Sequence, residues 1–355
     1  MLSATSEAQA LEDLHALGCT DGLPVVVPTR ERVQRMVLAC GLDGDLVLGE
    51  MGPANGIVSV EKIAVAAVMA GCLPDYMPLV VAAVKAVIDP RFDLTEMQAT
   101  THCTAPLIIV NGPARLTCGP VASGFGALGP GHRANASVGR ALRLAMINIG
   151  GGRPGESDMA LLGHPGKFTF CLAEDEEHSS LPPLHTSRGF AREDSVVTVI
   201  GAEAPHSALY SPVGDSAVDV GALVRVLAAG LANLATNNAV LRAGSATVVL
   251  NPDHAAVFTR ANVNREGIQK ALFEACTFSG RELNEVGGGF AVGGDDDVSY
   301  PCFRAAEDII VLMAGGSGLY SMVMPSWCAG AHRNAAVSVL VELDQFCEVP
   351  GSVST

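Results

Sequence analysis

Residues 126–177 read GALGPGHRANASVGRALRLAMINIGGGRPGESDMALLGHPGKFTFCLAEDEE. A glycine- and proline-rich loop opens into a helical pattern over residues 136–149, and a second such loop covers residues 150–166. A short strand over residues 167–173 then ends on the acids of residues 174–177. This order of loop, helix, loop and strand is typical of α/β proteins.

Apolar runs on both sides of this stretch predict further buried strands. These runs are residues 106–110, 195–201, 246–250 and 308–313. Helical patterns alternate with them, and those over residues 60–71 and 74–89 are rich in alanine and apolar on nearly every side. We therefore predict an α/β fold, with buried, mostly parallel sheets flanked by alanine-rich helices.

The chain is long enough for one large domain or two of ordinary size. We expect an N-terminal α/β domain over residues 1–190 that carries the candidate site, and a C-terminal α/β domain over residues 191–355. A single domain is the alternative. The sequence shows no convincing internal repeat.

The composition limits the partners of this protein. Apolar residues make up 49% of the 355 residues and charged residues only 17%, which favours buried subunit contacts and a homo-oligomer. The net charge of −15 argues against nucleic acid and against an anionic membrane surface. An anionic substrate must therefore be attracted by local cations.

The ten cysteines contain no CxxC pair, and the N-terminus lacks the basic region of a secretory signal. The longest apolar runs fall far short of the ~20 residues that span a bilayer. We therefore expect reduced thiols and a cytoplasmic location.

A site for a small anion is predicted where the loop GPGHRAN opens into the helix, because free N–H groups at a helix start attract anions. Arg133 would add a bidentate clamp, and Arg140 and Arg143 share one helix face. Asn135 and Asn111 complete the predicted substrate-binding set. The alternative is that Asn135 only caps the helix and that the arginines pair with surface acids.

The candidate catalytic residues are His102, Lys167, Cys171 and Glu174. Strand alternation places Lys167 and Cys171 on one face, and Glu174 follows at the strand end, where α/β sheets usually bind ligands. His102 precedes a buried strand and would be a proton shuttle. Cys171 is a credible nucleophile only with a cation nearby; the alternative is a buried, inert thiol.

The acidic run and the histidines near it are candidates for binding a divalent metal such as Zn, Mn or Fe. The candidate ligands are His102, Glu174, Glu177, His178 and His185. Their spacing matches no strong metal signature, and a solvated acidic loop is the alternative.

Residues 20–29, TDGLPVVVPT, resemble the opening of a bacterial family of UGSC-like proteins, which are grouped loosely with thioredoxins and thiol-disulfide isomerases. Further matches are the segments ATTH (99–102), VNGP (110–113) and PGKFTFC (165–171). The resemblance covers most of the chain. Its Cys/Sec-Gly-Ser-Cys motif corresponds here to GGSG (315–318), with glycine at both redox positions.

The resemblance implies an enzyme of small-molecule metabolism, with a small Cys- or Sec-containing partner subunit in a two-component form. From the residues we expect an enzyme that cleaves a bond in a small anionic metabolite by acid/base or thiol-assisted chemistry, with sulfur- and nitrogen-containing compounds among the candidate substrates. The alternatives are a metal-dependent hydrolase or oxygenase, and a non-catalytic subunit of a two-component redox enzyme.

Overall fold

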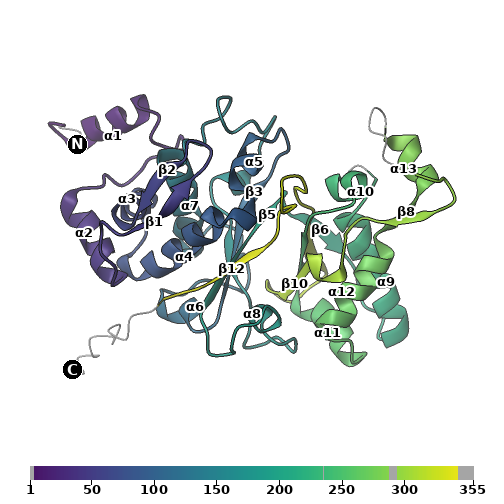
Figure 1. Ribbon diagram of the computed structural model, residues 1–355. Helices are drawn as coiled ribbons and strands as arrows, with labels where there is room; N and C mark the ends of the chain where they lie inside the picture. Colours follow the sequence, from purple (N-terminus) through teal and green to yellow (C-terminus); the bar gives the residue numbers. More distant parts are fainter. Residues whose placement is uncertain (1–3, 235, 288–293, 343–355) are drawn as a thin grey trace, which may run out of the picture.

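The computed structural model describes residues 4–234, 236–287 and 294–342. Within them, two four-stranded sheets lie face to face, and helices cover the outer side of each sheet (Figure 1). The layers run helix, sheet, sheet, helix.

The first sheet has the strand order β4-β3-β5-β12. Its strands are β3 (Ala105–Asn111), β4 (Cys171–Ala173), β5 (Val196–Ala202) and β12 (Val337–Leu340). The pair β3–β4 is parallel, whereas β3–β5 and β5–β12 are antiparallel.

The second sheet has the strand order β10-β7-β11-β6. Its strands are β6 (His206–Leu209), β7 (Ala246–Leu250), β10 (Ile309–Met313) and β11 (Tyr320–Met324). Here β7–β10 is parallel, whereas β7–β11 and β11–β6 are antiparallel.

Alternation along the central strands builds three apolar layers. Leu107 and Ile109 of β3 face the second sheet, which meets them with Ile310 and Leu312 of β10. Ile108 and its alternate neighbours face the helices of the first half. Both faces of these strands are therefore buried, and this is why the sequence reads there as continuous apolar runs.

The outer layer of the first half contains α3 (Val60–Ala70), α4 (Met77–Ile88) and α7 (Arg133–Asn148). Helices α4 and α7 contact the strands of the first sheet, and α3 packs on both of these helices. On the second sheet the corresponding layer is α9 (Ser216–Leu231), α11 (Pro252–Arg260) and α12 (Arg265–Ala275). The alanines of α3 and α4 are almost all buried, which permits close packing of these helices.

The remaining elements lie outside the two four-stranded sheets and these six helices. They are α1 (Glu7–Ala16), α2 (Arg30–Ala39), β1 (Val47–Met51), β2 (Gly56–Ser59), η1 (Pro74–Tyr76), η2 (Pro90–Phe92), α5 (Leu94–Ala99), α6 (Ala114–Thr117), η3 (Pro165–Lys167), α8 (Leu184–Ser187), α10 (Asn237–Leu241), β8 (Thr277–Ser279), α13 (Gly280–Val286), β9 (Ser299–Pro301) and η4 (Ala306–Asp308).

The two halves of the chain repeat one arrangement. In the order α4-β3-α7-β4-β5 and again in α9-β7-α12-β10-β11, the first strand is parallel to the second and antiparallel to the third. The leading helix covers the third strand, and the middle helix packs against the second. The sequence reveals no such repeat, because a shared architecture needs only a shared apolar pattern.

The next strand of each half joins the sheet of the other half. β6 follows β5 in the chain but pairs with β11, and β12 follows β11 but pairs with β5. Figure 1 shows β12, in yellow, lying among the strands of the first half. The predicted boundary at residues 190/191 therefore falls before two strands, β5 and β12, that belong to the first sheet.

The α/β class is confirmed, but each sheet contains one parallel pair rather than mostly parallel strands. The strand predicted over residues 167–173 is shorter than expected, because residues 165–167 form a 3-10 turn and only Cys171–Ala173 pair with β3. Among the described residues, no helix is long and apolar enough to cross a bilayer. The nine described cysteines are all free.

Candidate functional site

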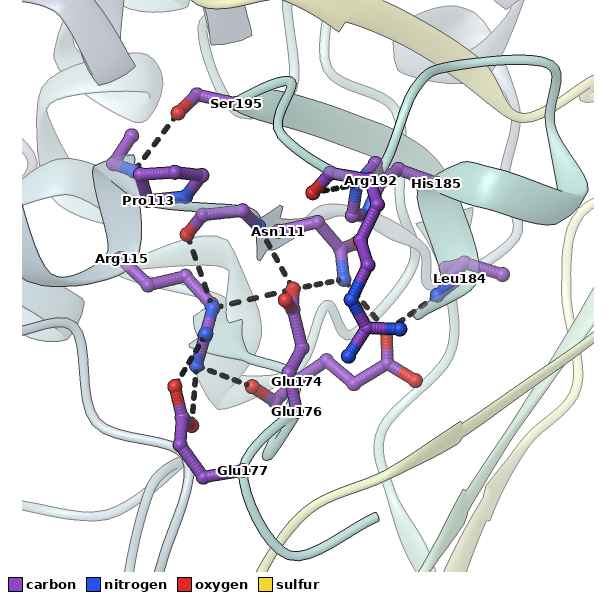
Figure 2. A network of polar contacts seen from close by, with 12 residues as sticks. Asn111, Pro113, Arg115, Glu174, Glu176, Glu177, Leu184, His185, Arg192 and Ser195 are labelled. Carbon is purple, nitrogen blue, oxygen red and sulfur yellow. Dashed lines mark hydrogen bonds and ion pairs between the residues drawn. The ribbon is translucent and has the colours of Figure 1, made fainter. Parts of the chain in front are cut away.

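Polar side chains meet at the carboxyl ends of β3 and β4 (Figure 2). We call this group the strand-end network, and its members are Asn111, Arg115, Glu174, Glu176, Glu177 and Arg265. Parallel pairing of Val110 with Ala173 places the residues that follow, Asn111 and Glu174, side by side. The amide Nδ2 of Asn111 donates to Glu174 Oε2 at 2.6 Å and to Glu176 Oε1 at 2.9 Å.

Glu174 is fully buried and holds a buried ion pair. Its Oε1 accepts from Arg265 Nη2 at 3.0 Å, and its Oε2 accepts from the Leu184 N–H at 2.6 Å. Burial raises the pKa of Glu174 to about 7, although Arg265, Leu184 and Asn111 act in the opposite direction. A carboxyl group with this pKa can hold or release a proton near neutrality.

Arg265, the first residue of α12, comes from the second half of the chain and is 2% exposed. It also donates to the carbonyl of Val311 at 2.9 Å and to that of Pro183 at 3.4 Å. Burial lowers its pKa from the usual range, against the effect of Glu174. The ion pair thus connects the first sheet to the helices of the second.

The network contains a second ion pair, between Arg115 and Glu177. Arg115 Nη1 and Nη2 bind the two carboxylate oxygens of Glu177 at 2.9 and 2.7 Å, and its Nε lies 3.2 Å from Glu176. Burial acts to lower the pKa of Arg115, but Glu177 and Glu176 raise it overall. Glu176 also accepts the Gly112 N–H at 2.7 Å.

The predicted metal ligands do not form a cluster. Among the described residues, no group of three or more His, Cys, Asp or Glu side chains is arranged to hold a metal ion. Glu177 forms an ion pair with Arg115, His178 is hydrogen-bonded to Asp175, and His102 is hydrogen-bonded to Glu203. His185 is fully buried, and its Nε2 lies 3.3 Å from the carbonyl of Arg192.

A cleft of about 540 Å³ lies elsewhere on the first half, beside the loop that follows α7. Its lining residues are Thr20, Asp21, Arg143, Ile147, Pro154, Asp158, Ala160, Leu162, Gly163, His164, Pro165, Lys167 and Phe168. We call it the Lys167 cleft. It combines an apolar wall with a few charged groups, as small-molecule sites usually do.

Two cations share one buried carboxylate in this cleft. Lys167 Nζ lies 2.8 Å from each oxygen of Asp158, and Arg143 Nη2 lies 2.9 Å from Asp158 Oδ2. The exposed fractions of these side chains are 17% for Lys167, 11% for Arg143 and 4% for Asp158. The three groups together carry one net positive charge.

Burial and charge both shift the pKa values here. Burial lowers the pKa of Lys167, although Asp158 acts to raise it. Burial acts to raise the pKa of Asp158, but the hydrogen bond and charge of Lys167 and the charge of Arg143 lower it overall. A lysine with a lowered pKa transfers protons more readily near neutral pH.

Two histidines lie close to this cleft. His164 Nδ1 accepts the Gly166 N–H at 3.1 Å, and therefore its Nε2, 3.2 Å from the Ala202 carbonyl, carries the proton. Burial lowers the pKa of His164 and so favours this neutral form. His102 is held between Glu203 at 2.9 Å and Asn237 at 3.0 Å, so both of its ring nitrogens are also engaged.

Two of the predicted substrate-binding residues hold the chain together instead. Arg140 binds both oxygens of Asp21 at 2.7 and 2.8 Å and so fixes the TDG segment at the cleft rim. Asn135 is buried, and its amide bonds to both the N–H and the carbonyl of Ala122 and to the carbonyl of Ala127. The amide of Asn135 is therefore already satisfied within the chain, and we do not carry this residue forward as a substrate ligand.

Cys171 does not meet the condition set for a nucleophile. It is 3% exposed, and burial, reinforced by the neighbouring Cys72, raises the pKa of its thiol. No described cation contributes to that shift. The thiol therefore belongs to the core, as the alternative interpretation held.

The candidate residues His102, Arg133, Cys171 and Glu174 make separate contacts. His102 is hydrogen-bonded to Glu203, and Glu174 forms an ion pair with Arg265. Cys171 is packed in the hydrophobic core. Arg133 donates from Nε and Nη2 to the carbonyl of Gly71.

The loop GGSG (315–318) is explained by geometry. Gly315 has a φ of 91° and Gly318 a φ of 152°, which favour glycine, and a Cβ on Gly316 would overlap the ring of Phe125. Packing and turn geometry thus account for the glycines of this loop.

Arg265, Asp158 and Arg115 were not singled out from the sequence. Arg265 stands at the start of an amphipathic helix, and nothing local connects it to Glu174, 91 residues away. Asp158 lies in a loop whose path the sequence does not define. The spacing of Arg140 and Arg143 did carry a signal, because both reach buried acids beside the cleft.

No family model matches this chain, and no curated protein and no solved structure is significantly similar to it. The resemblance to UGSC-like proteins therefore stays a prediction.

Proposed function

We propose that this protein is an enzyme that binds a small anionic metabolite in the Lys167 cleft and acts on it by acid/base chemistry. One observation carries the proposal: Lys167 and Arg143 share a single carboxylate on the wall of a 540 Å³ cleft. The excess positive charge suits one anionic group of the substrate. It is a local attraction within a chain of net charge −15.

Lys167 is the proposed acid/base group. Its Nζ has three hydrogens, two of which lie toward Asp158, so the third is available to a ligand in the cleft. The lowered pKa of Lys167 brings proton transfer nearer to neutral pH. Arg143 would hold the anion, and Asp158 would orient both cations.

The apolar residues of the cleft indicate the chemical nature of the rest of the substrate. Ile147, Leu162 and Phe168 line the cleft, and Leu162 is 94% exposed, so its side chain is free to contact a ligand. We therefore expect a carboxylate or phosphate on a body with an apolar portion. The role proposed for Lys167 is the catalytic role expected from the sequence, whereas no catalytic role is proposed for Cys171.

The test is a ligand-observed NMR screen of small carboxylates and phosphate esters, followed by turnover assays of each ligand found. Lys167→Met should remove binding or weaken it at least tenfold, because it removes the excess charge. Lys167→Arg should retain binding but lose turnover, because arginine stays protonated. The control Lys270→Met removes a lysine that is 73% exposed and should change neither. Equal turnover by wild type and Lys167→Met would refute the proposal.

A further inference from the structure

A second pocket, of about 230 Å³, lies where α2, the end of α3 and the start of α7 meet. Figure 1 shows these helices together at the N-terminal side of the molecule. Three arginines line it, Arg32, Arg35 and Arg133, and none of its lining residues is acidic. It shares no lining residue with the Lys167 cleft.

The structure orients one of the three guanidinium groups without neutralising it. Arg133 donates from Nε and Nη2 to the carbonyl of Gly71 at 3.2 and 3.0 Å. Gly71 ends α3 with a φ of 82°, a conformation that favours glycine. A carbonyl carries no net charge, so Arg133 keeps its full positive charge at the pocket.

The other two arginines lie three positions apart on α2 and so share a face. Arg32 is partly neutralised, because its Nη1 lies 3.0 Å from Glu7 and 2.8 Å from the carbonyl of Val27. Arg35 is exposed, and its guanidinium forms no hydrogen bond or ion pair with another described residue. After the Glu7 pair is subtracted, two positive charges remain.

We propose that this pocket binds the phosphate group of a small molecule, at a site separate from the Lys167 cleft. A phosphate near pH 7 carries between one and two negative charges, which matches the two uncompensated arginines. Guanidinium groups recognise phosphate oxygens with paired hydrogen bonds, and the mutual repulsion of the arginines is relieved by the anion. The apolar residues Met36, Val68 and Leu73 would contact the part of the ligand that bears the phosphate.

The anion that the sequence predicts beside Arg133 would bind in this pocket. Arg133 contacts the end of α3, not the cleft, so an anion there would be an additional ligand rather than the group held by Lys167. The proposal therefore does not depend on the proposed function.

The experiment is calorimetric titration of the wild-type protein with inorganic phosphate and with pyrophosphate at low ionic strength. Saturable binding is expected, and Arg35→Gln and Arg133→Gln should each weaken it about tenfold or more, since each removes a charge-assisted contact. Arg281→Gln is the matched control: it removes one exposed helical arginine in the second half and should leave the affinity within about twofold.

Thermal unfolding of each variant shows whether it is folded, and Arg35→Gln tests the proposal even if Arg133→Gln is unstable, because Arg35 is exposed. No saturable binding by the wild type would overturn the proposal. So would equal weakening by Arg281→Gln, which would indicate a diffuse charge effect. Loss of binding in Lys167→Met but not in Arg35→Gln would assign the phosphate to the cleft instead and would also overturn it.

Discussion

Replacing Arg265 with methionine leaves the Glu174 carboxylate buried without its cation. Arg265 is 2% exposed and Glu174 is fully buried, so water cannot replace the lost contact at 3.0 Å. The substitution also removes the donors to the carbonyls of Val311 and Pro183. Breaking a buried pair in this way typically costs about 3–5 kcal/mol of unfolding free energy.

The pH dependence separates this cause from a general packing defect. The pKa of Glu174 is already raised to about 7, and loss of Arg265 raises it further. A carboxyl whose folded pKa exceeds its unfolded pKa favours folding fully at low pH, and this contribution is lost as the pH rises through the folded value. The cost of Arg265→Met should therefore be larger at pH 8 than at pH 5.5.

The assay is urea unfolding of wild type and variant at these two pH values. The double variant Glu174→Gln/Arg265→Met should recover part of the loss, because it removes the uncompensated charge. Arg281→Met, which breaks an exposed ion pair with Asp297, should cost about 1 kcal/mol or less. A cost below 1 kcal/mol for Arg265→Met, or one that does not depend on pH, would refute the reasoning.

Three further predictions concern packing, the core thiol and acid stability. Gly139→Ala should cost about 1–3 kcal/mol, because its Cβ would overlap the segment leading into β4. Gly221→Ala in α9 should gain about 0.5–1 kcal/mol in chemical denaturation, because its Cβ would meet only the end of the Arg225 side chain, at 3.7 Å. Native Cys171 should resist iodoacetamide while half-buried Cys19 reacts, as mass spectrometry would show; early labelling of Cys171 would contradict its burial. The pKa of Asp158 is held below its usual range, so Asp158→Asn should reduce the loss of stability below about pH 4. An unchanged loss of stability at acid pH would count against the ion pairs of Asp158.

The layered core could be predicted from the sequence because its strands are apolar on both faces. Ile108 and Ile109 face opposite layers, so the run PLIIV reads as a buried strand without further information. The exchange of β6 and β12 between the halves could not be predicted, since pairing partners of short strands depend on the path of the whole chain.

The site was predicted only in part, for a similar reason. Asn111 and Glu174 were each named as candidates because each follows a predicted strand, but their contact was not predicted; the parallel pairing of β3 with β4 brings them together. The partner of Glu174 comes from α12, in the other half of the chain. Lys167 was identified as chemically active, but on a strand with Cys171, whereas a 3-10 turn directs it to Asp158 and the cleft.

The central claim is that the Lys167 cleft holds the anionic group of a substrate. The most direct measurement is a crystal structure of the wild-type protein with the ligand that the NMR screen identifies. The account predicts the ligand in the cleft, with its carboxylate or phosphate oxygens within hydrogen-bond distance of Lys167 Nζ or the Arg143 guanidinium. A ligand bound elsewhere, with the cleft occupied only by solvent, would contradict it.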